Sequence, residues 1–506
     1  MPVDPQDDYS SLRGPLDEQR GPVIIDDEDD SGLGPAFDTD DLDENAPLPP
    51  LDGDAAEDVL TRYLAIEADL ATRWPESKLE PSLDRVRAVA DLLGDPQSSV
   101  PVIHVAGTNG KTSTARMIEA LLRSFGLRTG LHTSPHLHSV RERIRIDGEP
   151  IDLEHFVRVH DDIAPYIDLV DARNAAEGNP KLSFFEVLTM LAYAAFADSP
   201  VDVAVIETGM GGAWDATNVV DGQVAVITPI ALDHTDYLGS TLAAIAGEKA
   251  GIIKHDSSVI LAQQSLDAAE VLLLRSAELG ASVAREGLEF GVLTRAPALG
   301  GQMLTLQGPA GVYDEVFLPL FGAHQASNAA VAVAAVEAFL GGGTKALNAD
   351  LLRVGFASVT SPGRLEIVRR DPTVLVDAAH NPHGALALAT SIADSFEFTA
   401  LVGVVAILAD KDVRGILVAL EPVLTEVVIT RNSSLRAADV DALAAIAVEV
   451  FGPERVEVVV RLADALDAAM ARADDLAGGL GGTGVLVTGS VMTAAEARSL
   501  LGRGDA

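Results

Sequence analysis

The sequence has 506 residues, of which 48% are hydrophobic and 22% charged, so it can bury a large core and fold into roughly two to four domains. Cysteine is absent, which excludes disulfides, thiolate metal sites and cysteine nucleophiles. The net charge of -40 disfavours a nucleic-acid partner, because a phosphate backbone would be repelled, and no apolar run is long enough to span a membrane.

Residues 1–54 differ in composition from the rest of the chain. They are acidic, rich in proline and glycine, and poor in aromatic residues, so they cannot bury enough apolar surface to offset the entropy of ordering. We predict a disordered acidic tail that keeps the protein soluble, with partner binding as the alternative. The start lacks the basic and apolar segments of a secretory signal, so we expect a cytoplasmic protein.

An alternation of helices and strands begins after the tail. Helical spacing of apolar residues covers 57–74, and short apolar runs predict buried strands at 100–107, 200–209 and 222–230. Helices are predicted at 112–126, where Gly126 would end the helix, and at 183–197. This alternation indicates the α/β class, with a parallel sheet covered on both faces.

The pattern changes near the middle of the chain. Residues 290–320 have the composition of short antiparallel strands with turns, and an alanine-rich helix is predicted at 326–340. Alternating α/β elements resume at 361. We therefore predict a central domain at 55–360 and a C-terminal domain at 361–506.

A glycine-rich segment, GTNGKTS at 107–113, lies between a predicted strand and a predicted helix. In that setting, backbone N–H groups and the helix N-terminus can hold phosphates. Lys111 would reach the outer phosphates and Thr112 a bound Mg²⁺. Val105 stands where the usual phosphate loop has its first glycine, so a simple strand-to-helix turn is the alternative. No NKxD motif is present, which favours ATP over GTP.

Several segments together resemble one family. HVAGTNGKTST resembles the loop of the Mur ligases, which form amide bonds with ATP. More narrowly, the chain resembles the folylpolyglutamate synthase/dihydrofolate synthase family through TSPHLHSVRERIRIDGEPI, ETGMGGAWDATNVV, ITPIALDHTDYLG, IAGEKAGIIK, PGRLEIV and VDAAHNPHGA, which occur in that order. The resemblance implies a Mur-ligase-like fold: an N-terminal P-loop ATPase domain with a parallel sheet and a small antiparallel sheet, followed by a Rossmann-like C-terminal domain.

The resemblance also implies a reaction. ATP phosphorylates the carboxylate of dihydropteroate or the γ-carboxylate of a reduced folate, and the amine of L-glutamate attacks the acyl phosphate. ADP and phosphate leave. The implied enzyme is an ATP-dependent acid–amino-acid ligase of folate biosynthesis and polyglutamylation, expected to act as a monomer.

By resemblance, Lys111, Glu207, His234 and Lys249 are the catalytic residues. Two Mg²⁺ ions would be held by Ser134, Glu207, His234 and Lys249, with Lys249 carbamylated to bind the second ion. Asp233 and Asp236 are alternative ligands or would hydrogen-bond to ligands. Ordinary structural roles are the alternatives for each: a turn for Ser134, a helix cap for Glu207, a core histidine for His234 and a salt bridge for Lys249.

The resemblance places further residues near ATP and the acceptor. ATP would contact residues in both domains: Gly107, Thr108, Asn109, Gly110, Lys111, Thr112, Ser113, Asn328, Arg364, Asp377 and His380. The pteroate or folate would lie near Leu79, Glu80, Pro81, Ser183, Phe184, Phe185, Glu186, Trp214, Asp215 and Ala216. Phe184 and Phe185 are adjacent on a helix, so at least one should belong to the core. Asp215 could bind the pteridine or hold its loop in shape.

One position departs from the family pattern. The family reads GGRxDATN, and Ala213 stands here in place of the arginine. This loss of a cation predicts weaker acceptor binding, compensation by another basic residue, or an impaired enzyme. Ala213 keeps open the alternative of a nucleotide-binding homologue without activity. Two further alternatives are another Mur-like amino-acid ligase and an interaction protein that acts through the acidic tail.

Overall fold

The computed structural model describes residues 53–74, 80–477 and 482–503. The predicted acidic tail, apart from its last two residues, and Leu79 lie outside the described residues. None of the described helices is long and apolar enough to cross a membrane.

The first and larger sheet has eight strands in the order β4-β3-β2-β5-β1-β6-β7-β8. All neighbours pair in parallel except β2–β3 and β3–β4 at one edge. The strands are β1 (Val102–Ala106), β2 (Thr129–His132), β3 (Ile144–Ile146), β4 (Glu149–Pro150), β5 (Val203–Glu207), β6 (Val224–Ile227), β7 (Ser258–Leu261) and β8 (Ser282–Arg285). The carboxyl ends of the parallel strands therefore share one edge, where ligands usually bind in such sheets.

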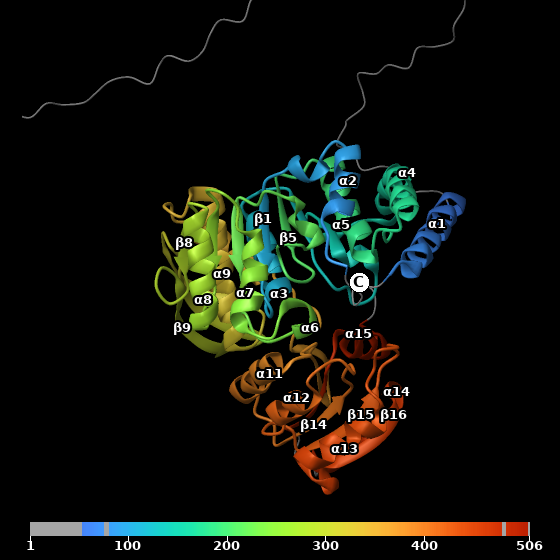
Figure 1. The fold of residues 1–506 in the computed structure, drawn as a ribbon. Coiled ribbons are helices and arrows are strands. Elements are labelled where there is room, and N and C mark those ends of the chain that lie inside the picture. The colour runs from blue at the N-terminus through green and yellow to red at the C-terminus, as the bar shows by residue number, and fades with distance from the viewer. Residues whose placement is uncertain (1–52, 75–79, 478–481, 504–506) are drawn as a thin grey trace, which may run out of the picture. The chain divides into compact units, whose positions relative to one another are not determined.

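Helices cover both faces of this sheet (Figure 1). On one face, a core formed by α3 (Lys111–Ser124), α9 (Ala323–Gly341) and α10 (Ala349–Ala357) continues into the small sheet described below. The cores on the other face include residues of α1 (Gly53–Thr72), α2 (Asp84–Leu92), α4 (Leu153–Glu177), α5 (Phe184–Asp198), α7 (Leu242–Lys249) and α8 (Leu266–Glu278). The central strands are consequently buried on both faces, which explains their continuous apolar sequences.

The predicted antiparallel segment forms a three-stranded sheet of β9 (Gly291–Ala298), β10 (Gly301–Gln307) and β11 (Val312–Leu318), in the order β11-β10-β9. Leu304, Leu306 and Val316 on its inner face are buried against α9. Alanines on α9 permit this close approach, since they lie between two sheets. The predictions of antiparallel strands and an alanine-rich helix are confirmed.

The C-terminal part has a six-stranded sheet in the order β12-β13-β17-β14-β15-β16, parallel except for the β12–β13 pair. Its strands are β12 (Glu366–Arg370), β13 (Thr373–Val376), β14 (Ala400–Val405), β15 (Glu426–Arg431), β16 (Val456–Arg461) and β17 (Thr483–Thr488). Its helices are α11 (Pro382–Ser395), α12 (Val413–Leu420), α13 (Val440–Phe451), α14 (Leu462–Ala477) and α15 (Val491–Leu500). They form two cores, one on each side of the sheet.

The predicted elements agree with the structure except at their ends. The strand expected at 200–209 is only Val203–Glu207, so Thr208 and Gly209 belong to the loop that follows it. The helix expected from 112 begins at Lys111 and ends at Ser124, and Gly126 has the positive φ of 85° that favours glycine after a helix. Strand ends in a parallel sheet turn into ligand-binding loops, and apolar content alone does not mark that change.

Candidate active site

A cavity of about 1190 Å³ opens at the carboxyl ends of strands from both parallel sheets. Most of the residues predicted from the sequence line it: Glu80, Pro81, Gly107, Thr108, Asn109, Gly110, Lys111, Thr112, Ser113, Ser134, Ser183, Phe185, Glu186, Glu207, Trp214, Asp215, Ala216, His234, Lys249, Asn328, Arg364, Asp377 and His380. Residues separated by up to 300 positions in the chain thus face one space. Phe184 does not line it.

The loop between β1 and α3 has a conformation that requires two glycines. Gly107 has φ 152°, and a Cβ there would lie 1.8 Å from Thr228 Oγ1. Gly110 has φ 87°, and a Cβ there would lie 2.7 Å from Asn328 Oδ1. The loop therefore presents bare backbone directly before the N-terminus of α3, as phosphate binding requires.

Lys111 begins α3 and folds over this loop. Its Nζ donates to the carbonyl oxygens of Gly107 and Thr108 at 3.2 and 3.3 Å. No carboxylate pairs with Lys111 among the described ion pairs, so its charge is directed to the cavity. A lysine in this position can neutralise an anion bound by the loop.

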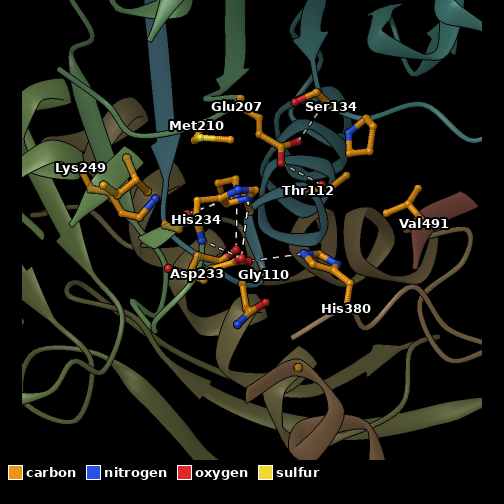
Figure 2. Close-up of a pocket in the computed structure, with 18 of the residues that line it drawn as sticks. Gly110, Thr112, Ser134, Glu207, Met210, Asp233, His234, Lys249, His380 and Val491 are labelled. Atoms are coloured by element: carbon orange, nitrogen blue, oxygen red, sulfur yellow. Dashed lines mark hydrogen bonds and ion pairs between the residues drawn. The ribbon is translucent and has the colours of Figure 1, made fainter. Parts of the chain in front are cut away.

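Glu207 ends β5 and is only 1% exposed. Its Oε1 accepts a hydrogen bond from Thr112 Oγ1 at 2.9 Å, and its Oε2 accepts one from the Ser134 N–H at 3.3 Å (Figure 2). Burial raises the pKa of Glu207, while Lys111 and these hydrogen bonds oppose that rise. The contacts bring three predicted oxygen ligands, from α3, β5 and the loop after β2, to one point.

A second chain of hydrogen bonds leads from α3 to α9 and to the start of the C-terminal part. Ser113 Oγ lies 3.0 Å from Ser361 Oγ and accepts from Gln325 Nε2 at 3.3 Å. Gln325 Oε1 in turn accepts from Asn328 Nδ2 at 3.1 Å. These contacts fix Asn328 beside Gly110, in a position suited to contact a nucleotide held by the loop.

Asp233 accepts several hydrogen bonds at the centre of the cavity. Its carboxylate accepts from Lys411 Nζ at 2.9 Å and from Asn381 Nδ2 at 3.0 Å. Burial opposes ionisation of Asp233, but the hydrogen bond from His380 and the charges of His234, His380 and Lys411 outweigh it and hold its pKa well below the usual range. Asp233 is therefore a permanent anion that joins the loop after β6 to the C-terminal part.

His234 has an unusual backbone for a non-glycine residue, with φ 50° and ψ 39°. Its N–H donates to Asp233 Oδ1 at 2.9 Å, which supports this left-handed conformation. Burial lowers the pKa of His234 to about 4, with smaller contributions from nearby positive charges. The ring is therefore neutral at pH 7 and can act as a ligand.

Lys249 ends α7 and is 3% exposed. Within the described part of the chain, its Nζ has no hydrogen bond or ion pair. Burial, reinforced by the charge of Lys111, lowers the pKa of Lys249 to about 7. About half of the amine is then neutral at pH 7, and a neutral amine is the form that reacts with CO2.

The low pKa of Lys249 predicts a pH-dependent stability. The folded protein loses this proton near pH 7, whereas the unfolded chain loses it near the usual value of 10.5. The folded state binds fewer protons between these values, so this lysine makes the free energy of unfolding increase as the pH rises from about 7 to about 10. We expect Lys249→Met to remove that increase and to raise stability at pH 6.5 by about 1–3 kcal/mol.

Urea unfolding of protein treated with EDTA and kept free of bicarbonate, at pH 6.5 and pH 9, measures this effect. The matched control is Lys345→Met, which removes an exposed lysine of the same domain. Equal pH dependence in Lys249→Met and in the natural protein would contradict the prediction.

The C-terminal part contributes Arg364, Asp377 and His380. Asp377 Oδ1 and Oδ2 accept from the N–H groups of Ala379 and Leu365, both at 2.7 Å, and burial raises its pKa. The Arg364 side chain donates one hydrogen bond, from Nη1 to the carbonyl oxygen of Gly363 at 3.3 Å, and forms no ion pair in the described part of the chain. Its guanidinium can thus still bind phosphate oxygens.

The other end of the cavity contains the predicted acceptor residues. Glu186 is not free, because Arg85 Nη2 and Nε donate to it at 2.8 and 3.1 Å, and it closes a capping box with Ser183. Phe185 lines the cavity, whereas Phe184 packs on the core under the guanidinium of Arg143, 5.1 Å from its ring. The two phenylalanines therefore separate as adjacent helix residues must.

Asp215 holds its own loop. Its Oδ2 accepts from the Met210 N–H at 2.8 Å, and its Oδ1 accepts from the N–H and Oγ1 of Thr217 at 3.0 and 2.5 Å. The carboxylate also lines the cavity. Of the two predicted roles, the structure supports a role in shaping the loop, although Asp215 is buried and only 3% exposed.

Ala213 is exposed and does not line the cavity. Its backbone is fixed, since its N–H donates to the carbonyl of Glu248 at 2.8 Å. A longer side chain can extend from this position without displacing the core. We expect Ala213→Arg to leave stability unchanged and to raise the affinity for an anionic acceptor by roughly tenfold, measured as KM for that acceptor. Ala213→Gln is the uncharged control, and no gain over it would show that this loop does not use the cation.

Sequence patterns missed several residues of the cavity. Arg85 pairs with Glu186 and lies 5.2 Å over the Trp74 ring, and Lys411 pairs with Asp233. His136 lines the same wall, and burial lowers its pKa to about 4. Of these residues, only Lys411 could have been predicted from the sequence, because it follows the buried strand β14 in the C-terminal sheet.

The donor set fits a hard divalent cation at one place. Glu207 carboxylate oxygens, Thr112 Oγ1 and the Ser134 loop converge beside the phosphate-type loop. Oxygen donors of this kind suit Mg²⁺, which keeps several waters and binds few protein ligands. No group of three or more histidine or acidic side chains within the described ranges forms a complete metal site, so such an ion would also need oxygens from its ligand.

Comparison with known proteins gives two family matches. Residues 105–336 match the Mur ligase middle domain, and residues 363–491 match the Mur ligase glutamate ligase domain. A Mycobacterium tuberculosis protein named dihydrofolate synthase/folylpolyglutamate synthase is 54% identical over 463 residues, which span 88% of this chain and 95% of that protein.

Solved structures agree with these matches. The Mycobacterium tuberculosis folylpolyglutamate synthase complexed with ADP has a TM-score of 0.85 and 54% identity, covering 88% of this chain and 100% of that one. A folylpolyglutamate synthase solved with AMPPCP and folate has a TM-score of 0.74 and 31% identity, over 87% of this chain and 99% of that one. The Mur-ligase-like α/β fold expected from the sequence is confirmed.

Proposed function

The chain belongs to the dihydrofolate synthase/folylpolyglutamate synthase family of Mur ligases, and on that premise we propose that it joins L-glutamate to a pteroate or folate carboxylate at the expense of ATP. The observation that carries this proposal is the single cavity in which the loop at 107–113, Glu207 and the Trp214–Ala216 segment meet residues of the C-terminal part. The relatives solved with ADP, or with AMPPCP and folate, support a nucleotide and a folate as the ligands.

The reaction forms an acyl phosphate. A carboxylate oxygen of the acceptor attacks the γ-phosphorus, the bond to ADP breaks, and the glutamate amine then displaces phosphate to form the amide. Lys111 and Arg364 neutralise the phosphates, which otherwise repel the acceptor carboxylate. Asn328 and Asp377 contact the nucleoside end. Lys411 and His380 lie where the two parts meet, so they can exclude water from the reactive phosphate.

We assign Mg²⁺ to Glu207, Thr112 and Ser134, with His234 and a carbamylated Lys249 as ligands of a second ion. When bound, these ions supply charge neutralisation at the transferred phosphoryl group. Glu207 is held in place by the Thr112 and Ser134 contacts, and Asp233 orients His234. The buried, partly neutral amine of Lys249 supports carbamylation, because a charged ammonium could not react.

We propose a cytoplasmic monomer with a nucleotide-binding domain at 55–360 and a second domain at 361–506. The acceptor binds along Glu80, Pro81, Phe185 and Trp214, and the glutamate site lies on the C-terminal side of the cavity.

ADP release by purified protein tests the proposal. MgATP and L-glutamate are supplied with dihydropteroate, with a reduced folate, with a cell-wall peptide, or with no acceptor. Release that depends on glutamate and on both acceptors is expected for a bifunctional enzyme, and release with one acceptor assigns one activity. Release only with a cell-wall peptide acceptor would favour another Mur-like ligase, and ATP binding without any release would favour an impaired homologue.

A further inference from the structure

His104 is a fully buried histidine in the middle of β1, the strand that leads into the loop at 107–113. It lies outside the cavity lining, and the proposed reaction does not use it. Its Nε2 is 2.9 Å from Thr217 Oγ1, although the two residues are 113 positions apart in the chain. A hydrogen bond therefore joins the strand below the nucleotide loop to the loop at 210–217.

The direction of this hydrogen bond follows from the partners of Thr217. The hydroxyl of Thr217 has one proton, and it donates to Asp215 Oδ1 at 2.5 Å. Nε2 of His104 must then carry its proton and donate to Thr217 Oγ1. Burial, with smaller contributions from the charges of Lys254 and His132, lowers the pKa of His104 to about 3, so the ring is neutral at pH 7.

The other ring nitrogen of His104 is unfavourable for stability. His104 Nδ1 is buried and has no hydrogen-bond partner among the described residues. An unpaired buried acceptor is unfavourable, and an apolar side chain of similar size would avoid it. Histidine therefore brings an unpaired buried acceptor to this position, and the donor at Nε2 is what it adds in return.

The contacts continue from His104 to the cavity wall. Thr217 is fixed on a second side by Tyr193 of α5, whose OH donates to the Thr217 carbonyl at 2.7 Å. Thr217 orients Asp215, and Asp215 fixes the Met210 N–H at the other end of the loop. Met210 and Glu207 both line the cavity (Figure 2), and Trp214 and Ala216 lie within this loop and line it as well.

We propose that His104 is a positioning residue that holds the loop at 210–217 in its acceptor-binding shape by donating a hydrogen bond to Thr217. The role of His104 in acceptor binding rests on the proposed function. Its role in holding the loop does not, so the two roles can be tested separately.

The loop itself is tested by fluorescence. The chain has two tryptophans, so in a Trp74→Phe background the emission comes from Trp214 alone. His104→Met, which keeps the volume but has no donor, should increase the acrylamide quenching constant of Trp214 by about twofold. His104→Gln, whose amide can replace Nε2–H as the donor, should retain the low quenching. Equal quenching in the Met and Gln variants would overturn the proposal, whether or not the protein turns over a folate.

Steady-state kinetics of the natural chain and the same variants test the consequence. We expect His104→Met to lower kcat/KM for the acceptor by about tenfold while KM for MgATP changes less than twofold, and His104→Gln to recover most of the loss. Ser276→Ala, which removes a buried hydroxyl of α8 outside the cavity, is the control. Equal losses for the acceptor and MgATP would indicate a general structural role and overturn the proposal.

Discussion

Lys111→Ala should lower the turnover of ATP by about two orders of magnitude or more and leave the protein folded. The ammonium group is held over the loop by the Gly107 and Thr108 carbonyls and has no carboxylate partner among the described ion pairs. It is therefore available to neutralise phosphate charge, and one positioned charge of this kind has an effect of this size. The loss should appear in kcat more than in KM for the acceptor.

ADP release under saturating MgATP, L-glutamate and acceptor measures this effect. Lys345→Ala is the matched control, since it removes an exposed lysine of the same domain. Near-normal turnover in Lys111→Ala would exclude the phosphate-binding role and reduce the loop to a simple strand-to-helix turn. Because Lys111 also opposes the burial-driven rise in the pKa of Glu207, the variant should carry out its residual reaction at a higher pH optimum than the natural enzyme.

Glu207→Gln should abolish measurable turnover through loss of Mg²⁺ affinity. Glutamine has nearly the same shape and can still accept from Thr112 Oγ1, but it lacks the negative charge that attracts a cation. Its amide also faces the Ser134 N–H, so one hydrogen bond to that backbone is lost at a cost of about 1 kcal/mol. The fold should survive, because removal of a buried charge offsets part of that cost.

Calorimetric titration of the nucleotide-bound protein with Mg²⁺, together with turnover at increasing Mg²⁺, measures this effect. Glu119→Gln is the control: Glu119 is a buried carboxylate of the same domain that accepts from Thr129 Oγ1 and lies outside the cavity. Unchanged Mg²⁺ affinity in Glu207→Gln would show that Glu207 caps the neighbouring loops and does not bind the ion.

The local sequence determines much of the fold. Continuous apolar runs mark β1, β5 and β6, and the alanine-rich run marks α9, because strands and helices that are buried on both sides need apolar side chains on every face. The nucleotide loop is equally local: two glycines, a lysine and the start of a helix lie within seven residues.

The candidate site is only partly local. Its residues were named from a resemblance to a family, and their shared position in one cavity depends on strand order. Glu207 meets Thr112 because β5 and β1 are neighbours in the sheet, although 95 residues separate the two side chains. No periodicity in the sequence encodes which parallel strand pairs with which.

By itself the sequence determined the α/β class, several of the buried strands and helices, the nucleotide loop and the family to which the chain belongs. Tertiary structure alone decided which polar residues face ligands and which are already paired: Glu186 is held by Arg85, Asp215 by its own loop, and Asp233 by Lys411. The physical reason is that burial and charge pairing depend on neighbours distant in the chain. Those same neighbours determine that Lys249 has a pKa of about 7 and that His104 remains neutral.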